Sequence, residues 1–359
     1  MSRTFFRIDF LLLAPVVVLL IISLTTLFSV QEALFRSQLI SVSIGLIAFF
    51  FFSHIRLEVL RNGKIIFYCI SLILLGIVLA LGIESHGAVR WLSFFGITLQ
   101  FSEILKPFLA LVLASFLADT PFFTFKTFLK CIGFLLPVLL LIDLQPDLGN
   151  ALVYASVAFF VLIVRGFPWR WFGFLLLPFA IMLPFLWTRL HEYQRLRLLT
   201  FIHPTSDPLG ASYNSIQATI AVGSGSLLGK GLSQGTQSGL RFLPERHTDF
   251  IFATIAEGLG FIGASVIVVA FLFLCLQIYS IYQRAHDPFV KLFAVACFGF
   301  FLIQSFFNIG MNLGYLPIVG VTLPFVSFGG SSLVSSFIFL GILSSMSVDS
   351  QNKDVLEIR

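Results

Sequence analysis

The chain has 359 residues, of which 58% are hydrophobic and 11% are charged, and its mean hydropathy is +1.01. This composition excludes a soluble globular domain, because the chain could not present enough polar side chains to water. The formal net charge of +5 does not point to a nucleic-acid partner, since there is no soluble basic domain to carry it.

Apolar runs recur along the chain, and many reach the roughly 20 residues that a helix needs to cross a hydrocarbon core about 30 Å thick. We therefore predict an all-α integral membrane protein with about ten transmembrane helices, forming one domain over residues 1–359. The first run has no small-residue cleavage site behind it and is interpreted as a span rather than a signal peptide. The predicted spans lie near residues 10–30, 37–55, 65–83, 103–118, 127–144, 148–164, 168–188, 249–282, 289–314 and 324–347.

The basic residues indicate the orientation. With ten spans both termini lie on one side, and the segments on that side carry most of the Lys and Arg, whereas the short opposite loops carry only Arg36 and Arg90. Cytoplasmic loops are enriched in Lys and Arg, so both termini are predicted to be cytoplasmic. Residues 189–248 then form a large extracytoplasmic loop between the seventh and eighth spans, and the dense apolar and glycine content of Ile220–Gly231 argues against disorder.

Two other segments on the predicted outer side differ from ordinary loops. Residues 84–100 contain glycine, tryptophan and short apolar steps, which suggest a compact re-entrant or interfacial hairpin. Residues 316–332 are rich in proline and glycine at membrane depth. Non-helical backbone is tolerated there only where it is buried in protein or lines a cavity.

Ionisable residues near the fourth to sixth spans are candidate functional groups, because charges inside spans are costly. Glu103 and Lys106 stand three residues apart, close enough on one helical face to pair. They either neutralise each other, with Ser102 capping the helix, or contact a substrate. Further along, Asp147 beside Gly149 is typical of a turn with a helix cap.

The densest set of ionisable residues lies at the outer end of the eighth predicted span. Asp249 is the strongest candidate for a catalytic base, because partial desolvation at the boundary of an apolar helix raises the pKa of a carboxylate toward a useful value. A plain N-terminal helix acid would not need the neighbouring Arg241, Arg246 and His247. Glu257, two turns deeper, is interpreted as a packing or partner residue.

Other chemistries lack their sequence signatures. No second spaced cluster of His, Asp or Glu accompanies His247, so no closed metal site is expected. A loosely held divalent cation such as Mg²⁺ or Mn²⁺ that bridges phosphate groups stays open. The chain has no GxxxxGK[ST] phosphate loop and no GxSxG elbow, so nucleotide hydrolysis and serine acyl transfer are not expected.

These residues stand in blocks that resemble the SEDS family (shape, elongation, division and sporulation) and, within it, the RodA branch associated with rod shape. The resemblance covers nearly the whole chain. It departs from the usual pattern at Phe101, Asn150 and Ser226, where proline, threonine and glycine are common. The blocks are GAVRW (Gly87–Trp91), LQFSEILKP (Leu99–Pro107), QPDLGN (Gln145–Asn150), and the longer segments Asp207–Gly231, Gly235–Phe252 and Asn308–Ser332.

The resemblance implies a glycosyltransferase of the bacterial cytoplasmic membrane that polymerises lipid II, the undecaprenyl-pyrophosphate-linked disaccharide pentapeptide, on the outer face during cell elongation. Asp249 would deprotonate the 4-hydroxyl of the acceptor sugar, which attacks the anomeric carbon of the donor with inversion. Inversion needs no enzyme nucleophile. The candidate substrate-binding residues are Arg90, Glu103, Lys106, Arg197, Arg241, Arg246 and His247.

The resemblance also implies partners: the growing glycan strand, membrane lipids, the elongation machinery and a class B penicillin-binding protein, a single-span transpeptidase. Two other functions stay open. A lipid II flippase would fit the intramembrane Glu103 and Lys106 and broken helices near Pro317 and Pro324, although the candidate residues cluster on the outer side rather than at the midplane. A non-catalytic scaffold of the wall-synthesis complex would leave that cluster unexplained.

Overall fold

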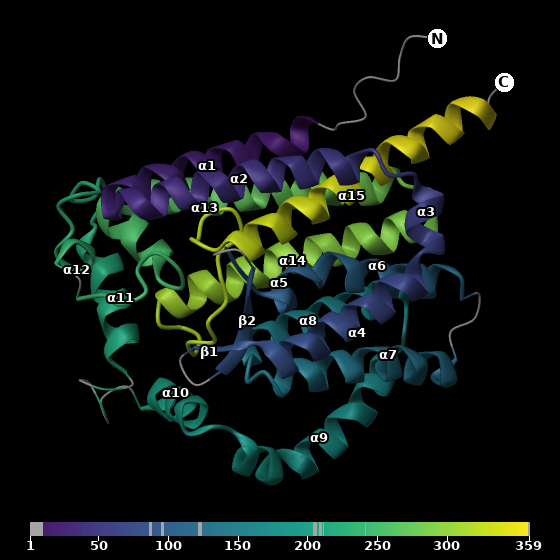
Figure 1. Ribbon diagram of the computed structural model, residues 1–359, viewed down its shortest axis with the longest axis horizontal. Helices are drawn as coiled ribbons and strands as arrows, with labels where there is room; N and C mark the ends of the chain where they lie inside the picture. The colour runs from purple at the N-terminus through teal and green to yellow at the C-terminus, as the bar shows by residue number, and fades with distance from the viewer. Residues whose placement is uncertain are drawn as a thin grey trace.

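The computed structural model describes residues 10–85, 88–94, 97–120, 124–203, 207, 210, 212–240 and 242–357. Within these residues, nine helical segments are long and apolar enough to cross a membrane, which confirms the all-α integral membrane fold (Figure 1). They are α1 (Phe10–Val30), α2 (Glu32–Ser53), α4 (Lys64–Leu81), α5 with α6 (Phe101–Ile104 and Lys106–Ala118), α7 (Phe125–Asp143), α8 (Leu148–Arg165), α13 (Ile251–Arg284), α14 (Pro288–Asn312) and α15 (Gly330–Glu357).

The seventh predicted span, residues 168–188, coincides with helix α9 (Trp169–Arg189), which is not one of these nine segments. Figure 1 shows α9 beneath the bundle, leading from the side of α7 to α10. The count of ten spans therefore stays a prediction. The short helix α3 (Leu57–Asn62) lies in the connection between α2 and α4.

A hairpin is present at residues 84–100, as predicted, and it is part of a sheet of three strands rather than two. Strands β1 (Ile83–Ser85), β2 (Ala88–Phe94) and β3 (Ile97–Leu99) form an antiparallel sheet in the order β1-β2-β3. Ile83 pairs with Trp91, and Leu92 pairs with Leu99. This small sheet carries Arg90 in β2, between the end of α4 and the start of α5.

The large loop between α9 and α13 is ordered where it is described, as expected for Ile220–Gly231. It contains α10 (Glu192–Ile202), α11 (Tyr213–Ser224) and α12 (Thr236–Gly239). The chain after α11 is hydrogen-bonded to α13 where that helix is interrupted at Gly260. Gly260 has a φ of 67°, a conformation that favours glycine. There the backbone N–H of Lys230 donates to Glu257 O at 3.0 Å, and that of Phe261 donates to Ser226 O at 2.9 Å.

The start of the last predicted span, at residue 324, is wrong. Helix α15 begins at Gly330, and the preceding residues are largely irregular. Pro317 and Pro324 lack the N–H that a helix needs, and Gly320 has a φ of 70°, so this stretch does not continue a helix. The predicted non-helical backbone within residues 316–332 is confirmed.

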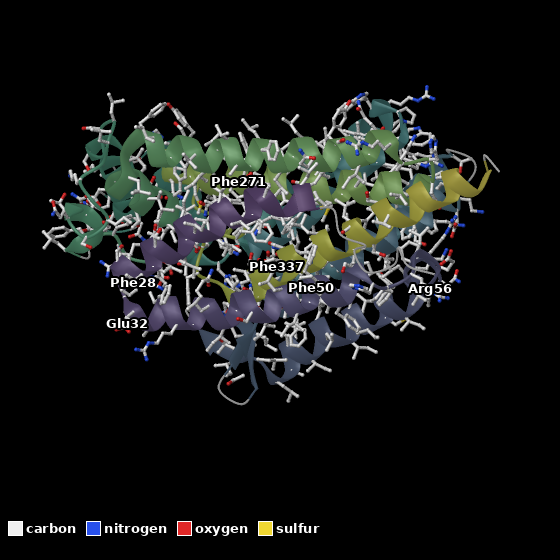
Figure 2. All side chains as sticks on the ribbon, turned by 90° about the horizontal axis from the view of Figure 1, so that it is seen from above. Phe28, Glu32, Phe50, Arg56, Phe271 and Phe337 are labelled. Carbon is white, nitrogen blue, oxygen red and sulfur yellow. The ribbon has the colours of Figure 1, made fainter. Side chains whose placement is uncertain are left out.

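Helix α15 lies along α2 and completes the core around α14. Figure 2 shows Glu32 at the start of α2 and Arg56 beyond its other end, at the start of α3. A Cβ at Gly45 of α2 would lie 2.3 Å from Cδ2 of Phe337, so glycine is needed for the two helices to approach this closely. On its other side α15 stacks its rings on α14: the ring centroids of Phe300 and Phe339 are 4.5 Å apart.

Candidate active site

Asp249 lies two residues before the start of α13 and is partly exposed, whereas the N-cap residue Phe250 is buried. Desolvation by the surrounding protein raises the pKa of Asp249 from 3.8 to about 6. Arg197 and Arg90 lower this pKa, while Glu245 and Asp147 raise it. A carboxylate with this pKa is largely ionised at neutral pH and is still basic enough to accept a proton in a transition state.

Two arginines from distant parts of the chain line one cleft, which we call the arginine cleft. Arg90 of β2 donates from Nε to Gln145 O at 3.1 Å and also donates to Pro146 O. Arg197 of α10 donates from Nη1 to Ile318 O at 3.3 Å. The arginine cleft is lined by Arg90, Pro146, Leu148, Gln194, Arg197, Leu198, Pro317, Ile318 and Val319.

Gly320 shows that Asp249 adjoins this cleft. A Cβ at Gly320 would lie 3.6 Å from Oδ2 of Asp249 and 3.9 Å from Nη1 of Arg197. The glycine therefore leaves open the space between the carboxylate and the guanidinium. The structure thus brings three of the predicted site residues, Asp249, Arg90 and Arg197, to one place.

Asp147 caps α8, as its position beside Gly149 predicts. Its Oδ1 accepts from the backbone N of Asn150 at 3.2 Å. Its Oδ2 accepts from Gln100 Nε2 at 2.9 Å, Ser102 Oγ at 3.2 Å and Asn150 Nδ2 at 2.8 Å. This buried carboxylate is held in place by its donors and contributes negative charge near Asp249.

Glu103 and Lys106 form the predicted pair. Lys106 Nζ lies 2.7 Å from Glu103 Oε1, and both residues are buried, with Glu103 5% and Lys106 3% exposed. Ser102 does not cap this helix, because its hydroxyl donates to Asp147 and the N-cap position is Gln100. Lys106 Nζ also lies 5.5 Å from the ring centroid of Phe300. Lys106 lines an apolar cavity among α6, α7 and α8 and is not among the residues that line the arginine cleft.

Two of the predicted substrate-binding residues, Arg246 and His247, precede Asp249 and contact neighbouring segments, and their binding role stays a prediction. Arg246 donates to the carbonyl of Ser238 in α12. The His247 ring packs against Phe328, with centroids 5.7 Å apart. Desolvation lowers the pKa of His247, Glu245 raises it and Arg246 lowers it, and the net lowering favours the neutral imidazole. The predicted site residue Arg241 lies outside the described residues.

Glu257 is a packing residue, as predicted. It is fully buried, and its carboxylate accepts from Gln237 N at 2.9 Å and from Ser238 N and Oγ at 2.9 and 2.7 Å. It therefore holds the start of α12 against α13.

The described part of the chain contains no group of three His, Cys, Asp or Glu side chains that could hold a metal ion. Asp147 is already engaged by four hydrogen-bond donors. A divalent cation at this site would have to take most of its oxygen ligands from a substrate pyrophosphate and from Asp249.

Sequence reasoning assigned no role to two residues that hold the main chain of Asp249. Asn308 and Asn312 of α14 are fully buried and contact the Asp249 carbonyl. Two amides four residues apart in an apolar span lie on one helical face, and polar residues inside membrane spans mark functional positions. That spacing was the signal that could have found them.

The model of the cell cycle protein family FtsW/RodA/SpoVE matches residues 2–352. The peptidoglycan glycosyltransferase MrdB of Escherichia coli K12 is 40% identical over 308 residues, covering 85% of this chain and 83% of that protein. The MrdB protein of Helicobacter pylori is 33% identical, covering 96% of this chain and 91% of that protein. A probable peptidoglycan glycosyltransferase FtsW of Hydrogenovibrio crunogenus is 31% identical, with coverages of 97% and 93%.

Solved structures share the fold. A chain from a structure of a peptidoglycan synthase complex that coordinates polymerization and crosslinking superposes with a TM-score of 0.85, at 30% identity, covering 96% of this chain and 99% of that one. The rod shape determining protein RodA of Thermus thermophilus superposes with a TM-score of 0.75, at 27% identity, with coverages of 97% and 99%.

Proposed function

The chain belongs to the FtsW/RodA/SpoVE family and is a peptidoglycan glycosyltransferase of the membrane, and from this premise we propose that it polymerises lipid II with Asp249 as its general base. The observation that supports this assignment is the convergence of Asp249, Arg90 and Arg197 at the arginine cleft. A base and two fixed cations are the groups that transfer from a pyrophosphate-linked sugar requires.

In the proposed reaction Asp249 accepts the proton of the acceptor 4-hydroxyl. The acceptor oxygen bonds to the anomeric carbon of the donor, the bond from that carbon to the pyrophosphate oxygen breaks, and undecaprenyl pyrophosphate leaves. Arg90 and Arg197 stabilise the charge that develops on the leaving pyrophosphate, because guanidinium groups bind phosphate oxygens in a planar, bidentate manner. Attack opposite the leaving group inverts the anomeric centre.

We propose that the arginine cleft faces the outside of the bacterial cytoplasmic membrane and that both termini face the cytoplasm. A basic cluster at the other end of the bundle supports this orientation. There Arg61 and Lys64 pair with Asp119, and Arg165 donates to Thr120 O. Basic residues are enriched on the cytoplasmic side. Figure 1 shows that α1 begins and α15 ends toward the same end of the molecule, away from α11 and α12.

The mechanism is tested by Asp249→Asn, which keeps the size of the side chain but removes its basicity. Single-turnover consumption of lipid II by purified protein should fall by about 10²–10⁴-fold, with donor binding and Tm retained. Asp143→Asn, which changes an exposed carboxylate in α7, is the matched control and should keep its rate. Near-wild-type polymer from Asp249→Asn would overturn the base assignment, and loss of donor binding would make Asp249 a positioning residue instead.

We also propose that a class B penicillin-binding protein binds α13 and α14 through its single membrane helix. The two helices carry neighbouring apolar grooves, one lined by Leu272, Leu302 and Phe306 and the other by Phe261 and Ala264. A membrane helix needs such an apolar face with small residues for close packing. Ala264→Trp should therefore reduce co-purification with the transpeptidase while polymerisation by the isolated protein continues.

The flippase alternative predicts that the precursor moves across the membrane without being joined. It is less well supported, because Asp249 and the arginine cleft are formed by connections and helix ends, namely β2, α10 and the segments before α13 and α15. Formation of polymer from lipid II by detergent-purified protein, in which no membrane gradient exists, separates the two functions.

A further inference from the structure

We propose that Asn308 and Asn312 of α14 are positioning residues that set the placement of Asp249 for proton transfer. This inference rests on the proposed function of Asp249 as the base. Both amides are fully buried, and both Nδ2 groups donate to the Asp249 carbonyl oxygen, at 3.1 Å from Asn308 and 2.9 Å from Asn312.

Asn312 occupies the place of a helical hydrogen bond. In a continuous helix the Asp249 carbonyl would accept from the N–H of Ala253. Here the Asn312 side chain bridges these two groups, because its Nδ2 donates to Asp249 O and its Oδ1 accepts from Ala253 N at 3.0 Å. The inserted amide separates Asp249 from the first turn of α13 while satisfying both backbone groups.

Asn308 joins Asp249 to the opposite wall of the site. Its Nδ2 also donates to Val321 O at 2.8 Å. Val321 follows Gly320, the residue that leaves open the space between Asp249 and Arg197. One amide therefore fixes the distance between the base and the segment that borders the arginine cleft.

The two preceding carbonyls are held in the same way by the segment before α15. Ser327 Oγ donates to Thr248 O at 2.7 Å, and the backbone N of Phe328 donates to His247 O at 2.8 Å. Three successive carbonyls, from His247 to Asp249, thus accept hydrogen bonds from outside their own segment. Fixing the main chain limits the positions that a short side chain such as that of Asp249 can reach.

The position of Asn312 requires an amide, since an amide supplies a donor for the Asp249 carbonyl oxygen and an acceptor for the Ala253 N–H. Leucine has a similar size but neither function. Aspartate keeps the acceptor and loses the donor that faces Asp249 O. We therefore expect Asn308→Leu, Asn312→Leu and Asn312→Asp to lower single-turnover polymerisation of lipid II by about 10- to 100-fold while the Kd for lipid II stays within about twofold, because small misplacements of reacting groups have effects of this order.

The matched control is Gln304→Leu. Gln304 is also a fully buried amide of α14, and its Nε2 donates to Thr322 Oγ1 at 3.0 Å, so it joins α14 to the segment before α15 at a residue that does not hold the carbonyls of His247, Thr248 or Asp249. It should lower Tm by an amount similar to that of the asparagine variants and keep its polymerisation rate. An equal loss of rate in Gln304→Leu would show that the asparagines are merely structural and would overturn the proposal.

A double-mutant comparison tests whether the asparagines act through Asp249. In an Asp249→Asn background, Asn312→Leu should reduce the residual rate by less than about twofold, because residues that act as a unit are non-additive. A further 10- to 100-fold loss in that background would overturn the proposal. Full activity of Asp249→Asn would show that the base assignment fails. An inactive Asp249→Asn together with fully active Asn308→Leu and Asn312→Leu would show that only the positioning role fails. Should a leucine variant not fold, Asn312→Asp provides the same comparison.

Discussion

At the scale of single residues, the environment of Asp249 sets the pH range of catalysis. The base must be ionised to accept a proton, so with a pKa of about 6 the rate should fall tenfold per pH unit well below pH 6 and level off above pH 7. Arg197 lowers this pKa. Arg197→Gln should therefore move the acid limb of the pH–rate profile to higher pH, whereas Arg197→Lys should leave it near its original place. The profile is measured as single-turnover rates at saturating lipid II, and an acid limb that stays in place in Arg197→Gln would contradict this coupling.

Glu103 and Lys106 form a buried pair whose two members depend on each other. Removing one partner leaves an uncompensated charge, so Lys106→Met should lower the free energy of unfolding by about 3–5 kcal/mol. Replacing both, as Glu103→Leu with Lys106→Met, should recover most of that stability because neither charge then remains buried. Thermal unfolding in detergent measures both effects.

The same variants decide whether the pair contacts a substrate. Lys106 lines an apolar cavity and neither residue lines the arginine cleft, which leaves two roles open: neutralisation within the bundle and contact with the donor. Full polymerisation by the stable double variant would reject substrate contact. A rate loss with unchanged stability would support it.

At the scale of secondary-structure elements, the contact between the α11–α12 connection and the break in α13 requires glycine. A Cβ at Gly225 would lie 1.9 Å from Ala256 O, which is backbone and cannot move aside. Gly225→Ala should therefore separate the connection from α13 and lower Tm by several degrees. Gly223→Ala is the control, because a Cβ there meets no atom within 4 Å, and in helix α11 alanine should raise stability by about 0.5–1 kcal/mol. Equal melting temperatures in the two variants would argue against this packing.

At the scale of the whole molecule, the proposed orientation separates an outer site from a cytoplasmic basic cluster. In a background without cysteine, Gln234→Cys in the large loop should react with a membrane-impermeant thiol reagent in intact spheroplasts. Gln283→Cys near the end of α13 should react only after lysis. Both positions are exposed to solvent or the membrane surface, so protection reports sidedness. The opposite labelling pattern would reverse the topology.

Part of the fold and the site could be predicted from the sequence because the relevant signals are local. A membrane span depends on the length of one apolar run, so most spans were placed to within a few residues. The cap at Asp147, the pair of Glu103 with Lys106 and the position of Asp249 before α13 also depend on residues close together in the chain. The start of α15 at Gly330 was missed because Val326 and its apolar neighbours fit a span by hydropathy while proline and glycine prevent the helix.

Tertiary structure alone decided which polar groups meet. Arg90 lies in a strand, Arg197 lies in α10 and Asp249 lies just before α13. Tertiary packing places the two arginines in one cleft and Asp249 beside it, while Lys106 lines another cavity. The contact of Asn312 with Asp249 spans 63 residues. Hydropathy records how apolar a segment is, but the direction in which a buried amide or guanidinium points depends on the crossing of helices far apart in sequence, and only the folded chain specifies that crossing.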